Sequence, residues 1–228
     1  MNPSGLKVTG AWFQVGGNLT AAIGATRGFI GEEKVESKIV IVGSSLQALG
    51  YILQIIASND TGDEAERENQ NMCLENKSEM LDKMGIELLA LGNISNVIGT
   101  YFNINKQLKE NDYLIIVGNS LQSIGAFLGV EAALLQMKAI QRIIILGNSL
   151  QSLGAGLQAY QGIINVSKNE IENEGSMVDK KDKKDKKDKK DEKIIALIGI
   201  WIQAIGTIIS AIGLTIIEEE EKLEKINI

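Results

Sequence analysis

Six segments of the chain share one eight-residue pattern of small, polar and apolar positions: glycine, three residues, glutamine or asparagine, two residues, glycine. The copies occupy residues 10–17, 43–50, 92–99, 118–125, 147–154 and 199–206. Their glycines are Gly10, Gly17, Gly43, Gly50, Gly92, Gly99, Gly118, Gly125, Gly147, Gly154, Gly199 and Gly206, and their amides are Gln14, Gln47, Asn96, Gln122, Gln151 and Gln203. Positions i, i+4 and i+7 share one helix face, so the pattern predicts six helices, each with a glycine–amide–glycine stripe.

A glycine inside a helix costs about 1 kcal/mol relative to alanine. A chain that repeats this cost at a fixed phase recovers it where small residues let two helix backbones approach closely. We therefore predict an all-α fold, a six-helix bundle with glycine-lined contacts. In antiparallel helices the six amides fall at about one level. They form a hydrogen-bonded layer, line a polar lumen, or lie on the outer faces as ordinary helix formers.

The steps between copies indicate an internal duplication, since a short step followed by a long one occurs twice. This predicts a first three-helix half at 1–104 with a charged insert at 59–83. A second half follows at 105–217 with a charged insert at 168–193, and residues 218–228 form an acidic tail. The second insert contains the Asp-Lys-Lys triplets of 179–190, which we expect to act as a solvated spacer outside the packed body.

An α/β fold is the alternative. The runs KIVIV (38–42), YLIIV (113–117) and RIIIL (142–146) are rich in β-branched residues. Each precedes a glycine and a serine-containing turn, which is typical of a short strand that leads into a helix. The phosphate-binding patterns GxxxxGK[ST] and GxGxxG are both absent, so no nucleotide loop supports this alternative.

Composition and charge narrow the function. The net charge of −6 disfavours nucleic acid as a partner. The chain has no histidine, which removes Ser-His-Asp triads and histidine metal sites, and its single cysteine, Cys73, allows no intramolecular disulfide. We therefore expect no enzyme activity, no cofactor and no metal site. The first residues lack a basic stretch followed by an apolar one, so we expect no cleavable signal peptide.

Charged residues are nearly excluded from the six segments and crowd the connections. Residues 39–57 and 194–217 are apolar enough to be candidate membrane spans. The leading hypothesis is a non-catalytic structural protein that self-associates through its glycine-lined helices, at a membrane or in a layered intracellular or spore assembly. The alternative is an integral multi-span membrane protein with a polar central path, channel-like or toxin-like. The expected partners are further copies of the chain and, where the protein lies at a membrane, lipid.

The repeated G-[NS]-S-L-Q-[AS]-[LI]-G motif and the bias toward lysine, isoleucine and asparagine resemble uncharacterised repetitive proteins of spore-forming bacilli. The resemblance covers the six motifs and not the inserts. It implies no activity and no catalytic or binding residues.

Overall fold

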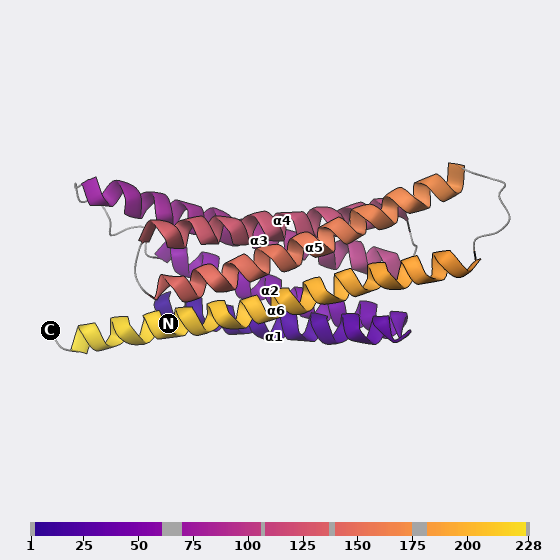
Figure 1. Cartoon of the computed structure of the whole chain (residues 1–228). Coiled ribbons are helices and arrows are strands. Elements are labelled where there is room, and N and C mark those ends of the chain that lie inside the picture. The colour runs from indigo at the N-terminus through magenta and orange to yellow at the C-terminus, as the bar shows by residue number, and fades with distance from the viewer. Residues whose placement is uncertain (1–2, 61–69, 106–107, 137–139, 175–181, 227–228) are drawn as a thin grey trace.

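Six long helices make up the computed structural model, which describes residues 3–60, 70–105, 108–136, 140–174 and 182–226 (Figure 1). The helices are α1 (Pro3–Phe29), α2 (Glu33–Asp60), α3 (Gln70–Asn105), α4 (Lys109–Gln136), α5 (Gln141–Glu174) and α6 (Asp182–Ile226). Each contains one copy of the motif. The prediction of an all-α six-helix bundle is therefore confirmed.

The alternative α/β prediction is wrong, because no strand occurs in the described ranges. The runs 38–42, 113–117 and 142–146 lie in α2, α4 and α5. Preference for strands is set largely by the surface against which a side chain packs. Here several of these β-branched residues lie on outer helix faces: Val42 and Val117 are exposed. The glycines that follow face a neighbouring helix and need no turn.

The helices form a closed ring in chain order. Each packs against the helices before and after it, and α6 returns to α1. Among the described residues, the backbones of helices that face each other across the ring do not meet. Six antiparallel helices bring both chain termini to one end of the bundle (Figure 1). We call this the terminal end, where α1 begins at Pro3 and α4 ends at Gln136, and the other the opposite end, where α1 ends at Phe29 and α2 begins at Glu33.

The connection between α1 and α2 is the tightest of those described. Gly31 has a φ of 101°, a left-handed conformation that favours glycine. Its N–H donates to the Gly28 carbonyl at 3.0 Å, and the Glu32 N–H donates to the Arg27 carbonyl at 3.0 Å. This C-cap ends α1 and reverses the chain into α2.

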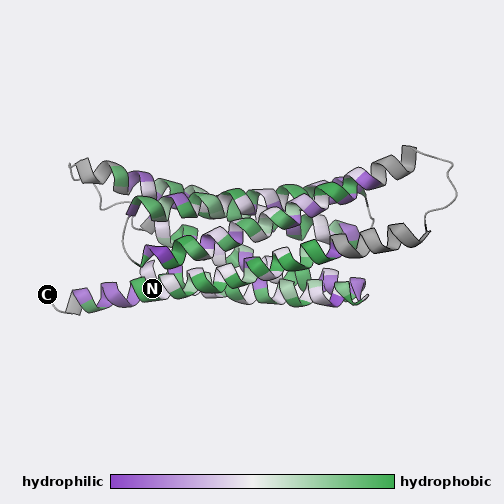
Figure 2. Ribbon diagram, viewed as in Figure 1, coloured by the Kyte–Doolittle hydropathy of each residue, from purple (hydrophilic) through white to green (hydrophobic). Residues whose placement is uncertain are grey.

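Most of the buried residues are small or polar, and many large apolar residues face outward. Among the described residues, thirteen of the buried hydrophobic positions are alanines: Ala11, Ala21, Ala22, Ala48, Ala57, Ala90, Ala126, Ala132, Ala133, Ala155, Ala159, Ala204 and Ala211. Exposed large residues include Trp12, Leu49, Ile98, Phe127 and Ile205. Figure 2 shows hydrophobic residues along the middle of the helices and hydrophilic residues toward their ends. Buried polar residues and exposed large apolar residues are the reverse of the distribution in an ordinary soluble bundle.

The charged inserts largely extend the helices. α3 begins at Gln70, within the first insert, and α5 and α6 extend into the second from both sides. The start of the Asp-Lys-Lys run lies outside the described residues, and from Asp182 the run forms the first turns of α6. The division into two halves at 104/105 concerns the internal duplication and stays a prediction.

Candidate functional site: an amide-lined interior

Consecutive helices form three hairpins, and glycines meet face to face in each one. A Cβ atom at Gly43 would lie 2.6 Å from the Gly17 carbonyl oxygen, and one at Gly17 would lie 2.5 Å from that of Gly43. Real Cβ atoms essentially never come so close, so only glycine allows this helix spacing. The reciprocal pairs are Gly10 with Gly50 and Gly17 with Gly43 in α1–α2, Gly85 with Gly125 and Gly92 with Gly118 in α3–α4, and Gly147 with Gly206 and Gly154 with Gly199 in α5–α6.

The motif amides pack over the glycines of the paired helix. The Gln47 side chain lies against Gly17, and that of Gln14 lies against Gly50. Gln122 packs on Gly92 in the same way, while Gln203 packs on Gly154. Each glycine thus leaves the space that a neighbouring amide stem fills. All six predicted amides, Gln14, Gln47, Asn96, Gln122, Gln151 and Gln203, are buried. The interpretation that places them on the outer faces is therefore wrong.

Helix α3 has a different register. Its paired glycines are Gly85 and Gly92, so Leu89 occupies the place between them that a glutamine takes in the other helices. Asn96 lies seven residues further on, toward the opposite end, and packs against Gly118. Gly99 faces the Asn111 carbonyl instead of a glycine. The six amides therefore do not share one level, since α3 contributes Leu89 to the layer of the five glutamines.

Hydrogen bonds join the motif amides mainly to amides that the motif does not include. The Gln14 Nε2 donates to Gln54 Oε1 at 2.9 Å, and the Gln158 Nε2 donates to Gln203 Oε1 at 2.7 Å. Gln54 and Gln158 follow Gln47 and Gln151 by seven residues, so the same stripe continued by one heptad would have predicted them. Asn96 Nδ2 donates to Asn119 Oδ1 at 2.7 Å.

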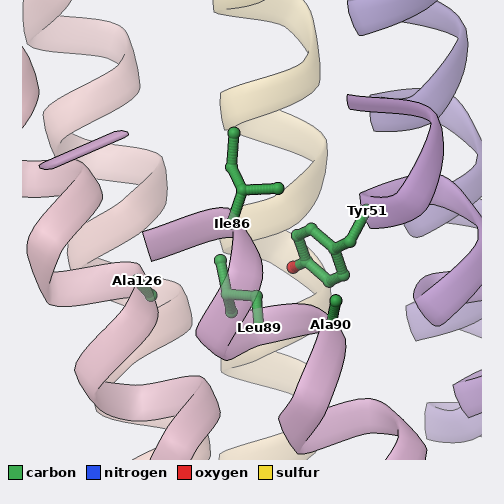
Figure 3. Packing of buried hydrophobic residues seen from close by; sticks show 5 residues of the cluster. All are labelled: Tyr51, Ile86, Leu89, Ala90 and Ala126. Atoms are coloured by element: carbon green, nitrogen blue, oxygen red, sulfur yellow. The ribbon is translucent and has the colours of Figure 1, made fainter. Parts of the chain in front are cut away.

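Two side-chain bridges cross the ring. The Gln203 Nε2 on α6 donates to Gln122 Oε1 on α4. The Tyr51 hydroxyl on α2 donates to Gln151 Oε1 on α5 at 3.5 Å. Tyr51 is almost fully buried, and Figure 3 shows its ring beside Leu89 and Ala90 of α3. The motif does not predict a role for Tyr51, because this residue lies just after the copy at 43–50.

A cavity of about 760 Å³ occupies the terminal half of the interior. Its walls include Tyr51, Leu89 and Gln151, and its outer rim carries the charged side chains of Lys7, Asp82, Glu218, Glu220, Glu221 and Glu224. The Lys7 Nζ lies 3.9 Å from Asp82 Oδ2. Partial burial raises the pKa of the Asp82 carboxyl, Lys7 lowers it and Glu79 adds a smaller upward shift. Acidic groups outnumber basic ones at this rim.

A second cavity of about 70 Å³ lies toward the opposite end. Its lining comes from all six helices and includes Asn18, Gln47, Asn93, Asn96 and Gln203, with no charged residue. The Gln122–Gln203 pair contributes to its wall, and the Tyr51–Gln151 pair contributes to that of the larger cavity. The interior is thus a polar space that crossing side chains divide in the middle.

The outer faces repeat large apolar residues at the same seven-residue period as the inward glycines. Val42, Leu49 and Ile56 form such a row on α2, and Ile198, Ile205 and Ile212 form one on α6. Three helices contain segments long and apolar enough to cross a membrane: Glu33–Asn59, Lys109–Gln136 and Lys193–Glu224, whose most apolar 18 residues have mean hydropathies of 1.9, 1.5 and 2.1. These segments belong to α2, α4 and α6, so each hairpin pairs one of them with a more polar helix.

Among the described residues, no three His, Cys, Asp or Glu side chains gather closely enough to hold a metal ion. The geometry defines a class of protein: a closed six-helix bundle with a polar, amide-bridged interior and an apolar exterior. The chain belongs to a family of unknown function (DUF6944), whose model matches residues 5–180. This range covers α1 to α5. Neither a curated protein nor a solved structure matches the chain.

Proposed function

We propose that the chain is an integral membrane protein whose six helices insert as one bundle around a polar central path for water or small cations. The observation that carries the proposal is the inversion of the bundle: the motif amides are buried, while most isoleucines, leucines and aromatic residues are not buried and many of them face outward. In water such an exterior is costly, because apolar surface stabilises a protein only when it leaves water. In lipid the same exterior is favourable, and hydrogen bonds between buried side chains pair many of the interior amides.

The positions of the charged residues support an orientation in which the helices cross the membrane. Uncharged stretches run through all six helices, at 8–26, 39–59, 88–105, 113–130, 143–167 and 194–217. At 1.5 Å per residue the shortest of them covers about 27 Å. A hydrocarbon core is about 30 Å thick and is crossed by about 17 to 25 residues. Most of the polar residues in the uncharged stretches of α1, α3 and α5 are buried or partly buried, so these helices would insert with their hairpin partners.

The ring supports a path along the bundle axis, since cavities of about 760 Å³ and 70 Å³ lie between its helices. The acidic rim of the terminal cavity favours cations over anions at its entrance. The Tyr51–Gln151 and Gln122–Gln203 bridges narrow the middle of the path. Passage through this point requires these side chains to move, which makes the present conformation a closed one in the proposal.

Self-association is the second candidate. The motif glycines are used between helices of one chain, so contacts between copies would rest on the outer rows such as Val42, Leu49 and Ile56. In a glycine-zipper assembly the glycines would face another copy, whereas here they face the adjacent helix. This favours the membrane hypothesis. In both candidates the protein acts without catalysis.

A charge on the outer face tests the proposal. Ile205→Lys places a lysine in the middle of an uncharged stretch, on an exposed row. A lysine at the centre of a membrane helix costs about 2.5–3.5 kcal/mol. We expect the unsubstituted chain to resist carbonate extraction from membranes and Ile205→Lys to lose part of that resistance. Glu219→Lys, an exposed position beyond the uncharged stretch, is the matched control and should insert normally.

A chain that is soluble without detergent, with Ile205→Lys more soluble still, would instead support the layered assembly.

Transport is measured separately. Purified protein in vesicles should raise cation permeability relative to empty vesicles, and Gln203→Leu, which removes a cross-ring bridge, should change that permeability. Insertion without any permeability would retain the membrane assignment and reject the path.

A further inference from the structure

The small cavity shows an imbalance between acceptors and donors. Five buried side-chain atoms have no hydrogen-bond partner among the described residues, and all five are amide oxygens: those of Asn18, Gln47, Asn93, Asn96 and Asn103. Four of these residues, all but Asn103, line the 70 Å³ cavity. A buried acceptor without a donor costs about as much as a lost hydrogen bond, so four around one space indicate a guest that supplies hydrogen-bond donors or positive charge.

Two of the oxygens have a defined orientation. The Asn93 Nδ2 donates to the Leu89 carbonyl at 2.8 Å, one turn earlier in the same helix. The Asn18 Nδ2 donates to Thr207 Oγ1 at 2.9 Å and to the Gln14 carbonyl at 3.3 Å. Backbone carbonyls accept only, so exchanging nitrogen and oxygen in either amide would set two acceptors against each other. Asn18 and Asn93 thus keep their oxygens away from these carbonyls.

Asn96 takes a smaller part. Its Nδ2 donates to Asn119, and its oxygen lies close to Gly118, on the side facing α4. The oxygens that are left for a guest are those of Asn18, Gln47 and Asn93, which come from three consecutive helices, α1, α2 and α3. The Ser44 and Thr100 side chains complete this side of the lining.

The neutral lining of the small cavity indicates what charge a bound metal cation would carry. No carboxylate lines the small cavity, whereas divalent cations in proteins are bound largely by carboxylates. Amide and carbonyl oxygens alone replace the hydration shell of monovalent cations, as in selectivity filters. The volume, about twice that of one water molecule in the liquid, also suits a small ion that keeps a single water.

We propose that the small cavity binds one partly dehydrated monovalent metal cation, of the Na⁺ or K⁺ class, through the side-chain oxygens of Asn18, Gln47 and Asn93. The inference rests on the proposed function only for the path by which the cation reaches the small cavity. Binding itself is an equilibrium property of the folded chain. The cation would then occupy the central path directly beyond the Gln122–Gln203 bridge.

Flow dialysis of the full chain in detergent micelles, with labelled Na⁺ and with Rb⁺ as the analogue of K⁺, tests the site. Choline replaces the metal cation at constant ionic strength, because it is too large for the cavity. We expect saturable binding of one ion per chain, and we expect excess unlabelled NaCl or KCl to displace it but choline chloride not to. The absence of saturable binding of both ions up to about 0.15 M, the physiological ionic strength, would overturn the proposal and leave a cavity filled by water.

Variants at two positions locate the ion. Gln47→Leu removes an unpartnered oxygen and should weaken binding by about tenfold or more. Gln54→Leu is the matched control, since this equally buried glutamine lines the large cavity and should leave the affinity unchanged. Gln47→Glu should increase the affinity, a gain that misfolding cannot produce. Equal losses in Gln47→Leu and Gln54→Leu would reject the site. Cation binding is measured in detergent micelles and needs no bilayer, so a failure to bind the cation is distinct from a failure of insertion or transport.

Discussion

Hairpins α1–α2 and α5–α6 repeat one arrangement, and hairpin α3–α4 departs from it. In the first two, the paired glycines flank Gln14, Gln47, Gln151 and Gln203. In the third, α3 lies one heptad further along and presents Leu89 at the equivalent place. Leu89 then packs with Tyr51, Ile86, Ala90 and Ala126 as an apolar wall of the terminal cavity (Figure 3).

The shift also moves the asparagines of α3 toward the opposite end. Asn93 and Asn96 come to line the small cavity, where two of the unpartnered oxygens belong to them. One repeated motif can therefore build an asymmetric interior, because a slide of seven residues keeps the same face of a helix inward while it changes which side chain lies at each level.

The largest expected effect comes from the glycine pairs that the hairpins share. Gly43→Leu in α1–α2 and Gly125→Leu in α3–α4 each place a side chain where even a Cβ would lie 2.6 Å from a carbonyl oxygen. Each should lower the free energy of unfolding by about 3 kcal/mol or more. Denaturing-detergent titration or the melting temperature measures this.

Gly16→Leu is the control, since a Cβ there meets nothing within 4 Å. It should be neutral or stabilise its helix by up to about 1 kcal/mol. Similar melting temperatures for all three variants would contradict the role of close glycine contacts. A loss in Gly43→Leu alone would show that the third hairpin is more loosely packed than the first.

The next effect separates the glutamine positions from Leu89. Gln151→Leu removes the donor to Ser210 Oγ at 3.0 Å and the acceptor for Tyr51, and should cost about 1–3 kcal/mol. Leu89→Gln places an amide among apolar neighbours and should cost a similar amount. Because Leu89 lies at the level of the five glutamines, a Leu89→Gln chain with unchanged or higher stability would show that a ring of six amides forms there and would contradict the apolar wall.

A smaller effect is expected at the bridge between α2 and α5. Tyr51→Phe removes a hydroxyl that lies at a long 3.5 Å from Gln151 Oε1, and should cost at most about 1 kcal/mol. The same change should raise cation permeability in vesicles, since the bridge narrows the path. Tyr160→Phe, at an exposed tyrosine, is the control. Full additivity of Tyr51→Phe with Gln151→Leu in stability would argue against the bridge.

The smallest effect concerns the acidic rim. Because the pKa of Asp82 is raised in the folded chain, the native state binds its proton more tightly than the unfolded chain does. Stability therefore falls as the pH rises from the ordinary aspartate pKa to the raised one. Asp82→Asn should remove this slope, with a gain at neutral pH below about 1 kcal/mol for so exposed a side chain. If the melting temperature of Asp82→Asn depends on pH in the same way as that of the unsubstituted chain, the slope comes from other groups.

The local features of this protein could be predicted from the sequence. The period of Gly10, Gln14 and Gly17 predicted a helix and its inward face, because helical geometry depends only on residues within two turns. Two of the three interpretations of the motif amides place them in the interior, as the flanking glycines indicate, and the six amides are buried. The same period extends the stripe to Gln54 and Gln158, which lie one heptad beyond the eight-residue motif.

The arrangement of the helices relative to one another was decided only by the tertiary structure. A seven-residue repeat makes registers that differ by one heptad equivalent in sequence, so the pairing of Gly85 with Gly125, and the position of Leu89 beside Tyr51, depend on how whole helices pack. The ring order, the bridge from Gln122 to Gln203 and the two cavities have the same origin. They join residues far apart in the chain, for which the local pattern holds no information.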